Sequence, residues 1–148
     1  MCSRDDATKV ELVCVDPARI QQIWPHLKEL LREACQRTGL SAFADLEADI
    51  LSGCSLVWIA WNGQAIEAAA STILTNSDLG KVCVITLCAG RGLNRWLNLV
   101  ERIESYAKDE GCTRIRIFGR KGWLRVLEGY DAKHVIMDKE LGSPRATA

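Results

Sequence analysis

The stretch that decides the fold runs from Val82 to Gly111 and reads VCVITLCAGRGLNRWLNLVERIESYAKDEG. It begins with an apolar run, Val82 to Leu87, which is typical of a buried strand. A glycine-containing turn follows, and then an amphipathic helix from about Leu93 to Asp109, which the glycine at 111 ends. A helix that starts directly after a strand presents free backbone N–H groups and the positive end of its dipole at the turn. The junction therefore suits a phosphate group.

Downstream, Thr113 to Phe118 alternates isoleucine with arginine and predicts another strand. Because a helix connects this run to Val82–Leu87, the two strands are predicted to lie parallel, joined by a right-handed crossover. The glycine-rich segment 119–122 leads into a predicted short helix, Trp123 to Glu128. Lys133 to Leu141 is predicted as the last strand, before a polar tail at 142–148.

Upstream, Lys9 to Val15 suits a first strand, and Asp16-Pro17 predicts the start of a long helix that ends at Gly39. Pro25 should kink that helix or separate its first turn. Ser41 is predicted to cap a second helix that ends near Gly53.

Two further runs, Ser55–Trp61 and Ala65–Leu74, flank Asn62-Gly63. Asn-Gly between two such runs predicts a β-hairpin, because both residues tolerate positive φ. Lys81–Leu87 is then expected as a third antiparallel neighbour.

Composition limits the function classes. The 148 residues predict one domain spanning 1–148, with a core at about 9–141. Nineteen basic residues balance nineteen acidic ones, which argues against nucleic acid as a partner. No apolar run is long enough to span a membrane and the N-terminus is too polar for a signal peptide, so a cytoplasmic location is expected.

Cysteine and histidine do not form a recognisable metal site. The seven cysteines are odd in number and lack a C-x-x-C pair, and only His26 and His134 accompany them. We expect no metal, and buried free thiols in a reducing compartment. Cys88, where the loop begins, is either a nucleophile or a buried thiol, and Trp61 and Trp96 are either core or exposed binding residues.

The order of predicted elements from about Lys9 to Leu141 is similar to the GNAT acetyltransferase superfamily. Specific echoes are the Asn-Gly hairpin, Arg91-Gly92 and Leu127-Glu128-Gly129-Tyr130. The resemblance implies an α/β (α+β) fold, with a mixed, mostly antiparallel central sheet of about six to seven strands flanked by about four helices.

The resemblance also implies acetyl-CoA as cofactor. The family's Q/R-x-x-G-x-G/A loop matches Arg91 to Trp96, so Asn94 and Trp96 stand where the family has small residues. The Trp96 indole either fills the space of the CoA diphosphate or turns into the core. A shifted register with Gly90-Arg91-Gly92 as G-x-G would put Leu87 at the first position. The residues implied to bind the cofactor are Leu87, Cys88, Arg91, Gly92, Leu93, Asn94, Arg95 and Trp96.

The catalytic acid and base are not identified by pattern. Leu127 stands where many GNAT enzymes have a tyrosine that protonates the thiolate, and Val82–Leu87 carries no glutamate to serve as base. The candidates that remain are Glu67 on the neighbouring strand and Tyr130.

Two hypotheses follow. The first is an acetyl-CoA-dependent N-acetyltransferase with a degenerate acyl-CoA loop, acting on a small or protein amine. The second is a non-catalytic GNAT-like interaction or structural subunit, with a protein partner or a homo-oligomer. Gly119-Arg120-Lys121-Gly122-Trp123 also resembles GNAT-like proteins of phages and prophages, which would place this subunit in a bacteriophage particle. The sequence does not identify the acceptor amine, because the amine would bind the first helices and the loops, which vary within the family.

Overall fold

The computed structural model describes residues 10–90, 93–119 and 121–142 and shows one five-stranded sheet in the order β1-β2-β3-β4-β5. Neighbouring strands are antiparallel except β4 and β5, which are parallel. The parallel pair flanking a helix was predicted from Val82–Gly111 and is confirmed. The strands are β1 (Glu11–Cys14), β2 (Leu56–Trp61), β3 (Ile66–Ser77), β4 (Gly80–Gly90) and β5 (Arg114–Ile117).

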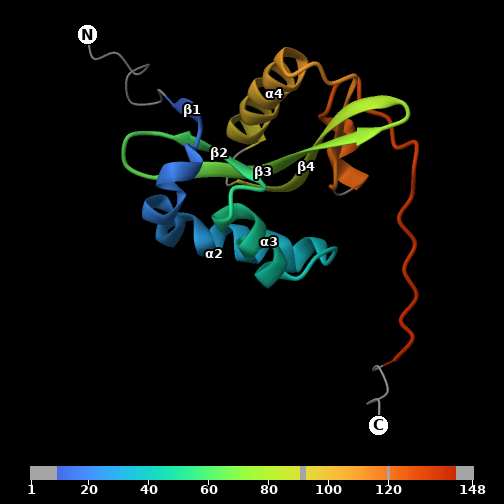
Figure 1. Cartoon of the computed structure of the whole chain (residues 1–148), viewed down its shortest axis with the longest axis horizontal. Coiled ribbons are helices and arrows are strands. Elements are labelled where there is room, and N and C mark those ends of the chain that lie inside the picture. The colour runs from blue at the N-terminus through green and yellow to red at the C-terminus, as the bar shows by residue number, and fades with distance from the viewer. Residues whose placement is uncertain (1–9, 91–92, 120, 143–148) are drawn as a thin grey trace.

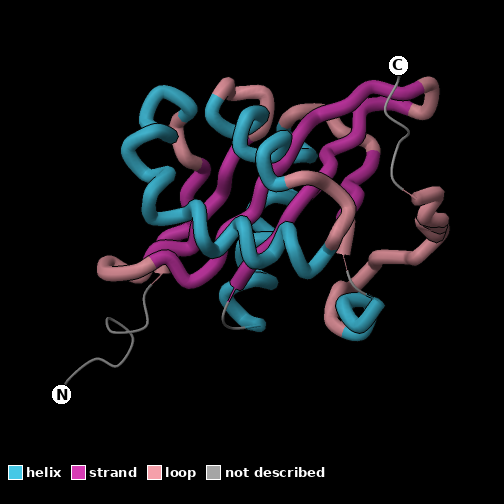
Figure 2. The backbone as a smooth tube through the Cα atoms, turned by 90° about the horizontal axis from the view of Figure 1, so that it is seen from below, coloured by secondary structure: helices cyan, strands magenta, loops and turns pink. Residues whose placement is uncertain are grey.

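Helices cover both faces of the sheet. As Figure 1 shows, α2 (Ile20–Thr38) and α3 (Phe43–Leu51) lie on one face, and α4 (Leu93–Asp109) lies on the other. Figure 2, seen from below, looks onto a face of the sheet, with helices overlying the strands. Two short 3₁₀ helices, η1 (Pro17–Arg19) and η2 (Lys121–Arg125), complete the described elements. None of the helices in these described ranges is long and apolar enough to cross a membrane.

Each face of the sheet has its own apolar core. The α2-side core joins α2 and α3 to one set of strand side chains, including Val57, Ile59, Leu87 and Ala89. The α4-side core joins α4 to the opposite set, including Trp58, Ala60, Ile85, Cys88 and Trp96. The alternation of side chains along each strand produces this division.

A β-bulge in β4 changes that alternation. Ser71 pairs with Leu87 and Thr72 pairs with Ile85, which leaves Thr86 without a partner on β3. The Thr86 hydroxyl lies 2.6 Å from the Ser71 hydroxyl and 3.2 Å from the Ser71 carbonyl oxygen. The extra residue shifts the side-chain parity of the strand. Ile85 therefore contacts the α4-side core, whereas Leu87 and Ala89 contact the α2-side core.

Two local predictions about the first half of the chain need correction. Asp16 caps a helical start at Pro17 as expected, but this start is the separate 3₁₀ helix η1, and α2 begins only at Ile20. Pro25 does not split off the first turn, because α2 continues through it to Thr38. Ser41 does not cap α3. The N-cap is Ala42, with no side-chain hydrogen bond, and the carbonyl oxygen of Ser41 instead accepts from the Cys35 thiol.

The Asn62-Gly63 hairpin is confirmed, but its turn differs from the expected one. Only Gly63 has a positive φ, 97°, whereas Asn62 acts through its side chain. The Asn62 carboxamide oxygen accepts from the backbone N–H groups of Gln64 and Ala65 at 2.8 and 2.7 Å. Asparagine thus closes the turn by mimicking a backbone acceptor.

The C-terminal predictions were wrong in part. The helix expected at Trp123–Glu128 is the 3₁₀ helix η2, which ends at Arg125. The strand expected at Lys133–Leu141 forms no ladder, and residues 131–142 are exposed and run away from the sheet (Figure 1). Five strands and three α-helices in the described residues therefore replace the six to seven strands and about four helices that were expected.

Candidate functional site

A cleft of about 800 Å³ opens between α2 and the sheet, at the end where β4 finishes. Its size is that of a small-molecule site. Residues of α2, of strands β1 and β2, of the β2–β3 turn and of the strand ends line it: Val13, Ile23, His26, Glu29, Leu30, Glu33, Arg37, Ile59, Trp61, Gln64, Ala65, Ile66 and Gly90.

The two walls of the cleft differ in polarity. Along α2, His26, Glu29, Glu33 and Arg37 recur every three or four residues and so share one stripe of the helix. Trp61 and other apolar residues of the sheet form the opposite wall. The cleft therefore offers titratable groups on one side and an apolar surface on the other.

The cleft meets β4 at Gly90, the last residue of that strand. β5 pairs only with Val82–Ile85, and the backbone N–H of Phe118 donates to the Ile85 carbonyl oxygen at 3.2 Å. From Thr86 to Gly90, no described strand lies on that side of β4. The bulge thus coincides with the point where β4 and β5 separate, and Gly90, at the end of the open half, lines the cleft.

Trp96 settles one alternative left by the sequence. Its side chain is 6% exposed and belongs to the α4-side core. The indole packs at a tilt against Trp123, with 4.7 Å between ring centroids. Trp123 in turn lies against Gly119, where a Cβ atom would overlap the ring. The large residue in the first turn of α4 is therefore directed into the core.

The remaining residues of the acyl-CoA segment are only partly described. The side chains of Leu87 and Cys88 are buried in the two cores, so only their backbone faces the open half of β4. Burial raises the pKa of the Cys88 thiol to about 12, although a hydrogen bond from Trp96 opposes this. Such a thiol is protonated at neutral pH and is a poor nucleophile. Arg91 and Gly92 lie outside the described residues, and Leu93 and Asn94 are placed only as the start of α4.

Glu67 and Arg95 form a link between the sheet and α4. The Glu67 Oε2 atom lies 2.6 Å from Arg95 Nε, and both side chains are about a quarter exposed. The other Glu67 oxygen accepts a hydrogen bond from the Asn62 carboxamide at 3.3 Å. This candidate base is thus engaged with a cation and an amide, and it does not line the cleft.

Tyr130 lies on the α4 side of the sheet. Its hydroxyl donates to Glu104 Oε2 on α4 at 2.6 Å. Burial, followed by this hydrogen bond and the charge of Glu104, raises the pKa of Tyr130 well above its ordinary value. Leu127, at the position of the family's tyrosine, is buried in the α4-side core. The structure therefore does not bring Tyr130, Glu67 and the cleft together.

Comparison with solved structures places this architecture among known folds. An acetyltransferase of Trypanosoma brucei matches with a TM-score of 0.64 at 18% identity, over 90% of this chain and 100% of that one. An aminoglycoside acetyltransferase from an uncultured soil metagenomic sample, solved with sisomicin, matches at 0.69 and 9% identity over 90% and 97%. The aminoglycoside N-acetyltransferase AAC(6′)-Iy, solved with CoA, matches at 0.61 and 11% identity over 90% and 96%.

The fold is that of the GNAT acetyltransferases. No family model matches the sequence, and no curated protein matches it significantly. At these identities the likeness shows the GNAT fold alone.

Sequence reasoning missed the polar stripe of α2. Each of His26, Glu33 and Arg37 lies one or two positions along the sequence from a buried residue of α2. In an amphipathic helix such positions are expected on the exposed face. Only the cleft beside them distinguishes these residues from ordinary solvated ones.

Proposed function

We propose that the chain is an acetyl-CoA-dependent N-acetyltransferase whose acceptor amine binds the cleft beside α2. The single observation that carries the proposal is that Gly90, at the end of the open half of β4, lines that cleft. The GNAT fold and its CoA-bound neighbours support it. The burial of the Trp96 indole in the α4-side core also supports the proposal.

The residues near this edge fit an acyl-CoA. α4 begins at Leu93, three residues after the end of β4, so its free N–H groups lie at the end of that strand. Arg91 and the first turn of α4 would hold the diphosphate. The backbone groups of Thr86–Gly90 that face away from β3, where no described strand lies, would hold the acyl arm. Acetyl-CoA supplies the activated acetyl group. The amine nitrogen forms a bond to the carbonyl carbon of the acetyl group as the thioester carbon–sulfur bond of acetyl-CoA breaks. The CoA thiolate that leaves then takes up a proton.

The chain's own contribution is to bind and deprotonate the amine. Glu29 and Glu33 favour a cationic amine at the polar wall, although Glu29 also pairs with Arg32 at 2.8 Å. The His26 imidazole, one helical turn from Glu29, is the group in the cleft best suited to accept the proton that the amine loses. Trp61 and Ile66 form an apolar surface for the amine's carbon chain.

Thermal unfolding with acetyl-CoA tests the proposal first. A ligand bound only by the native state stabilises it, by about 1.4 to 2.7 kcal/mol at ten to a hundred times its Kd. For a domain of this size that corresponds to a rise of roughly 3 to 10 °C in Tm. Arg91→Ala should reduce the rise, whereas Arg19→Ala, a matched exposed arginine on η1, should not. An unchanged Tm at millimolar acetyl-CoA would reject the proposal and favour the non-catalytic subunit.

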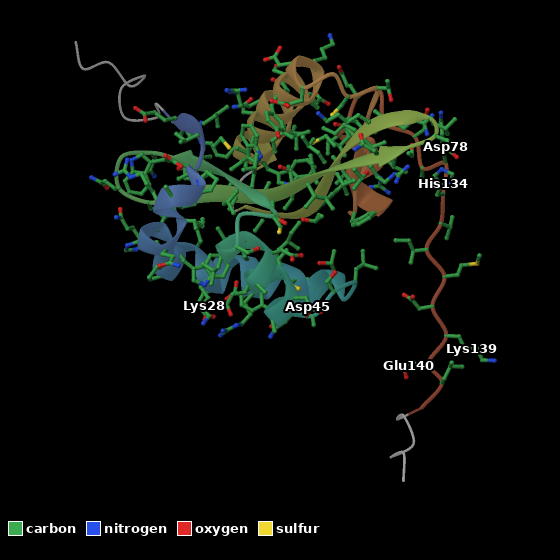
Figure 3. All side chains as sticks on the ribbon, viewed as in Figure 1. Lys28, Asp45, Asp78, His134, Lys139 and Glu140 are labelled. Atoms are coloured by element: carbon green, nitrogen blue, oxygen red, sulfur yellow. The ribbon has the colours of Figure 1, made fainter. Side chains whose placement is uncertain are left out.

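Acetylation of a panel of amines then tests the cleft. His26→Gln should lower kcat by about 10² or more, as expected on loss of a general base, while leaving the acetyl-CoA stabilisation intact. His134→Gln, on the exposed C-terminal segment and outside the cleft, is the matched control and should be neutral (Figure 3). Equal activity of His26→Gln and the parent chain would remove His26 from the mechanism without affecting the acetyl-CoA result.

A further inference from the structure

The polar stripe of α2 contains two neighbouring opposite charges. Glu33 and Arg37 both line the cleft and are one helical turn apart, so they lie one above the other on the same face of the helix. Both residues are exposed, and neither side chain forms a hydrogen bond or ion pair with another residue in the described part of the chain. A direct contact between exposed Glu and Arg at this spacing is weak, so a ligand can replace it at little cost.

A carboxylate beside a guanidinium matches the head of a free amino acid. The Glu33 carboxylate can accept hydrogen bonds from an α-ammonium group, and the Arg37 guanidinium can donate two parallel hydrogen bonds to a carboxylate. A free amino acid carries both charges on one carbon atom, so neighbouring side chains of opposite charge can bind both at once. A ligand with only one of these charges would use only half of the pair.

The stripe continues from this pair to His26 over an apolar residue. Leu30 lies between Glu33 and His26 on α2, lines the cleft and is half-buried. Trp61 lies on the opposite, apolar wall. Glu33 and His26 are two helical turns apart, which is about 10 Å. An amine on a chain of three or four methylene groups, with a hydrogen bond of about 2.9 Å at each end, covers this distance.

We propose that the acceptor is a free diamino acid of the length of lysine or ornithine, acetylated on its ω-amine. This inference rests on the proposed function. Arg37 binds the carboxylate and Glu33 binds the α-ammonium group. The methylene groups lie between Leu30 and Trp61, and the ω-amine lies beside His26. The ω-nitrogen bonds to the acetyl carbon as the thioester carbon–sulfur bond breaks, His26 takes the proton that the nitrogen loses, and the thiolate leaves.

The same charge pair disfavours two other acceptors. A lysine within a peptide has neither an α-ammonium nor an α-carboxylate, so Glu33 and Arg37 would have no group to bind. In a free diamino acid the α-amine loses its proton at lower pH than the ω-amine and is the more available nucleophile in solution. Glu33 holds that α-amine in its protonated form, which cannot attack. The site therefore directs acetyl transfer to the ω-nitrogen.

Titration with L-lysine, followed by NMR of the protein with and without CoA, tests the head-group assignment by itself. Cadaverine lacks the carboxylate, ε-aminocaproate lacks the α-ammonium group, and Nα-acetyl-lysine amide has neither charge. Each should bind at least about tenfold more weakly than L-lysine, because one or both side chains then lose their partner. No L-lysine binding in either condition, or equal affinity for L-lysine and the amide, overturns the proposal.

Two variants assign the charges one by one. Arg37→Met should reduce the preference for L-lysine over cadaverine at least about fivefold, and Glu33→Gln should do the same for the preference over ε-aminocaproate. Each variant should keep the preference that the other loses, a pattern that general damage to the cleft would not produce. Arg19→Met, at an exposed arginine of η1 that does not line the cleft, should change neither preference. If neither preference changes, or both fall together in each variant, the assignment is refuted.

Tandem mass spectrometry of the product formed with acetyl-CoA separates this inference from the proposed function. Transfer to the ω-nitrogen of L-lysine supports both. Transfer to the α-nitrogen, or to cadaverine in preference to L-lysine, refutes the diamino acid and leaves the acetyltransferase in place. Selective L-lysine binding without transfer to any amine refutes the proposed function but supports Glu33 and Arg37 as an amino-acid head-group site.

Discussion

Replacement of Trp96 by alanine should destabilise the protein strongly without creating acetyl-CoA affinity. The indole is 6% exposed and contacts Trp123 at 4.7 Å between centroids. Removal of a buried tryptophan costs about 3–5 kcal/mol, part of it from the cavity left behind. In a domain of 148 residues this lowers Tm by roughly 8–15 °C. Trp96→Phe keeps an aromatic ring in contact with Trp123 and should cost less, about 1–2 kcal/mol.

Urea unfolding followed by far-ultraviolet circular dichroism measures these losses, because the signal does not depend on tryptophan. A double-mutant cycle with Trp123→Ala should give a coupling of about 0.5–1.5 kcal/mol, as found for aromatic pairs. If Trp96→Ala changed stability by less than about 0.5 kcal/mol, the value typical of surface sites, the indole would not be in the core. If Trp96→Phe bound acetyl-CoA while the parent chain did not, the indole would be the obstruction and the placement argued from the core would be refuted.

Three other predictions concern polar contacts. The Trp24 indole N–H donates to Glu47 at 2.7 Å, and this hydrogen bond is the main reason that the pKa of Glu47 is lowered. The contact therefore stabilises the fold above the ordinary pKa of the carboxyl group, and this stabilisation is lost as the pH falls. Glu47→Gln should flatten the loss of stability between about pH 5 and 3, as measured by urea titration. The Glu67–Arg95 pair, a quarter exposed, should contribute about 0.5–1 kcal/mol in a double-mutant cycle that uses Glu67→Gln and Arg95→Met, and the coupling should shrink in 1 M salt. Burial raises the pKa of the Cys88 thiol to about 12, whereas the thiol of the unfolded chain has a pKa near 9, so the free energy of unfolding should fall as the pH rises above 9. Cys88→Ala should reduce the slope of unfolding free energy against pH by at most about 1.4 kcal/mol per pH unit. An unchanged slope would contradict the burial of this thiol.

The sequence predicted the elements whose signals are local and failed where a distant contact decides. The strand–turn–helix unit at Val82–Gly111 and the Asn62-Gly63 hairpin follow from periodicity and turn chemistry, and both are present. Lys133–Leu141 has an equally good strand pattern, but a strand exists only when another strand supplies its hydrogen bonds. None of the described strands of the chain does so. The same limit applies to the candidate site, because the pattern that makes His26 exposed on α2 contains no information about the cleft beside it.

The bulge at Thr86 explains why this end of the sheet, and not the other, can form a site. From Val82 to Ile85, β4 has a strand on each side, so its backbone groups are paired and unavailable to a ligand. The extra residue bends the strand and increases its twist, which separates it from β5 just where the pairing ends. It also turns Leu87 and Ala89 into the α2-side core and Cys88 into the α4-side core, so the open edge consists of backbone with its side chains buried.

The bulge is accompanied by a contact between the hydroxyl groups of Ser71 and Thr86, whose oxygen atoms are 2.6 Å apart. The sequence does not predict this bulge, because threonine is common in any strand rich in β-branched residues. Catalysis would then depend on a backbone displacement that two hydroxyl groups hold in place. Replacement of Thr86 with valine tests this role, because valine keeps the shape of the side chain but lacks the hydroxyl group. If the bulge needs that hydroxyl, Thr86→Val should weaken acetyl-CoA binding more than it lowers Tm; an equal loss of both would mean that the bend is set by the surrounding packing.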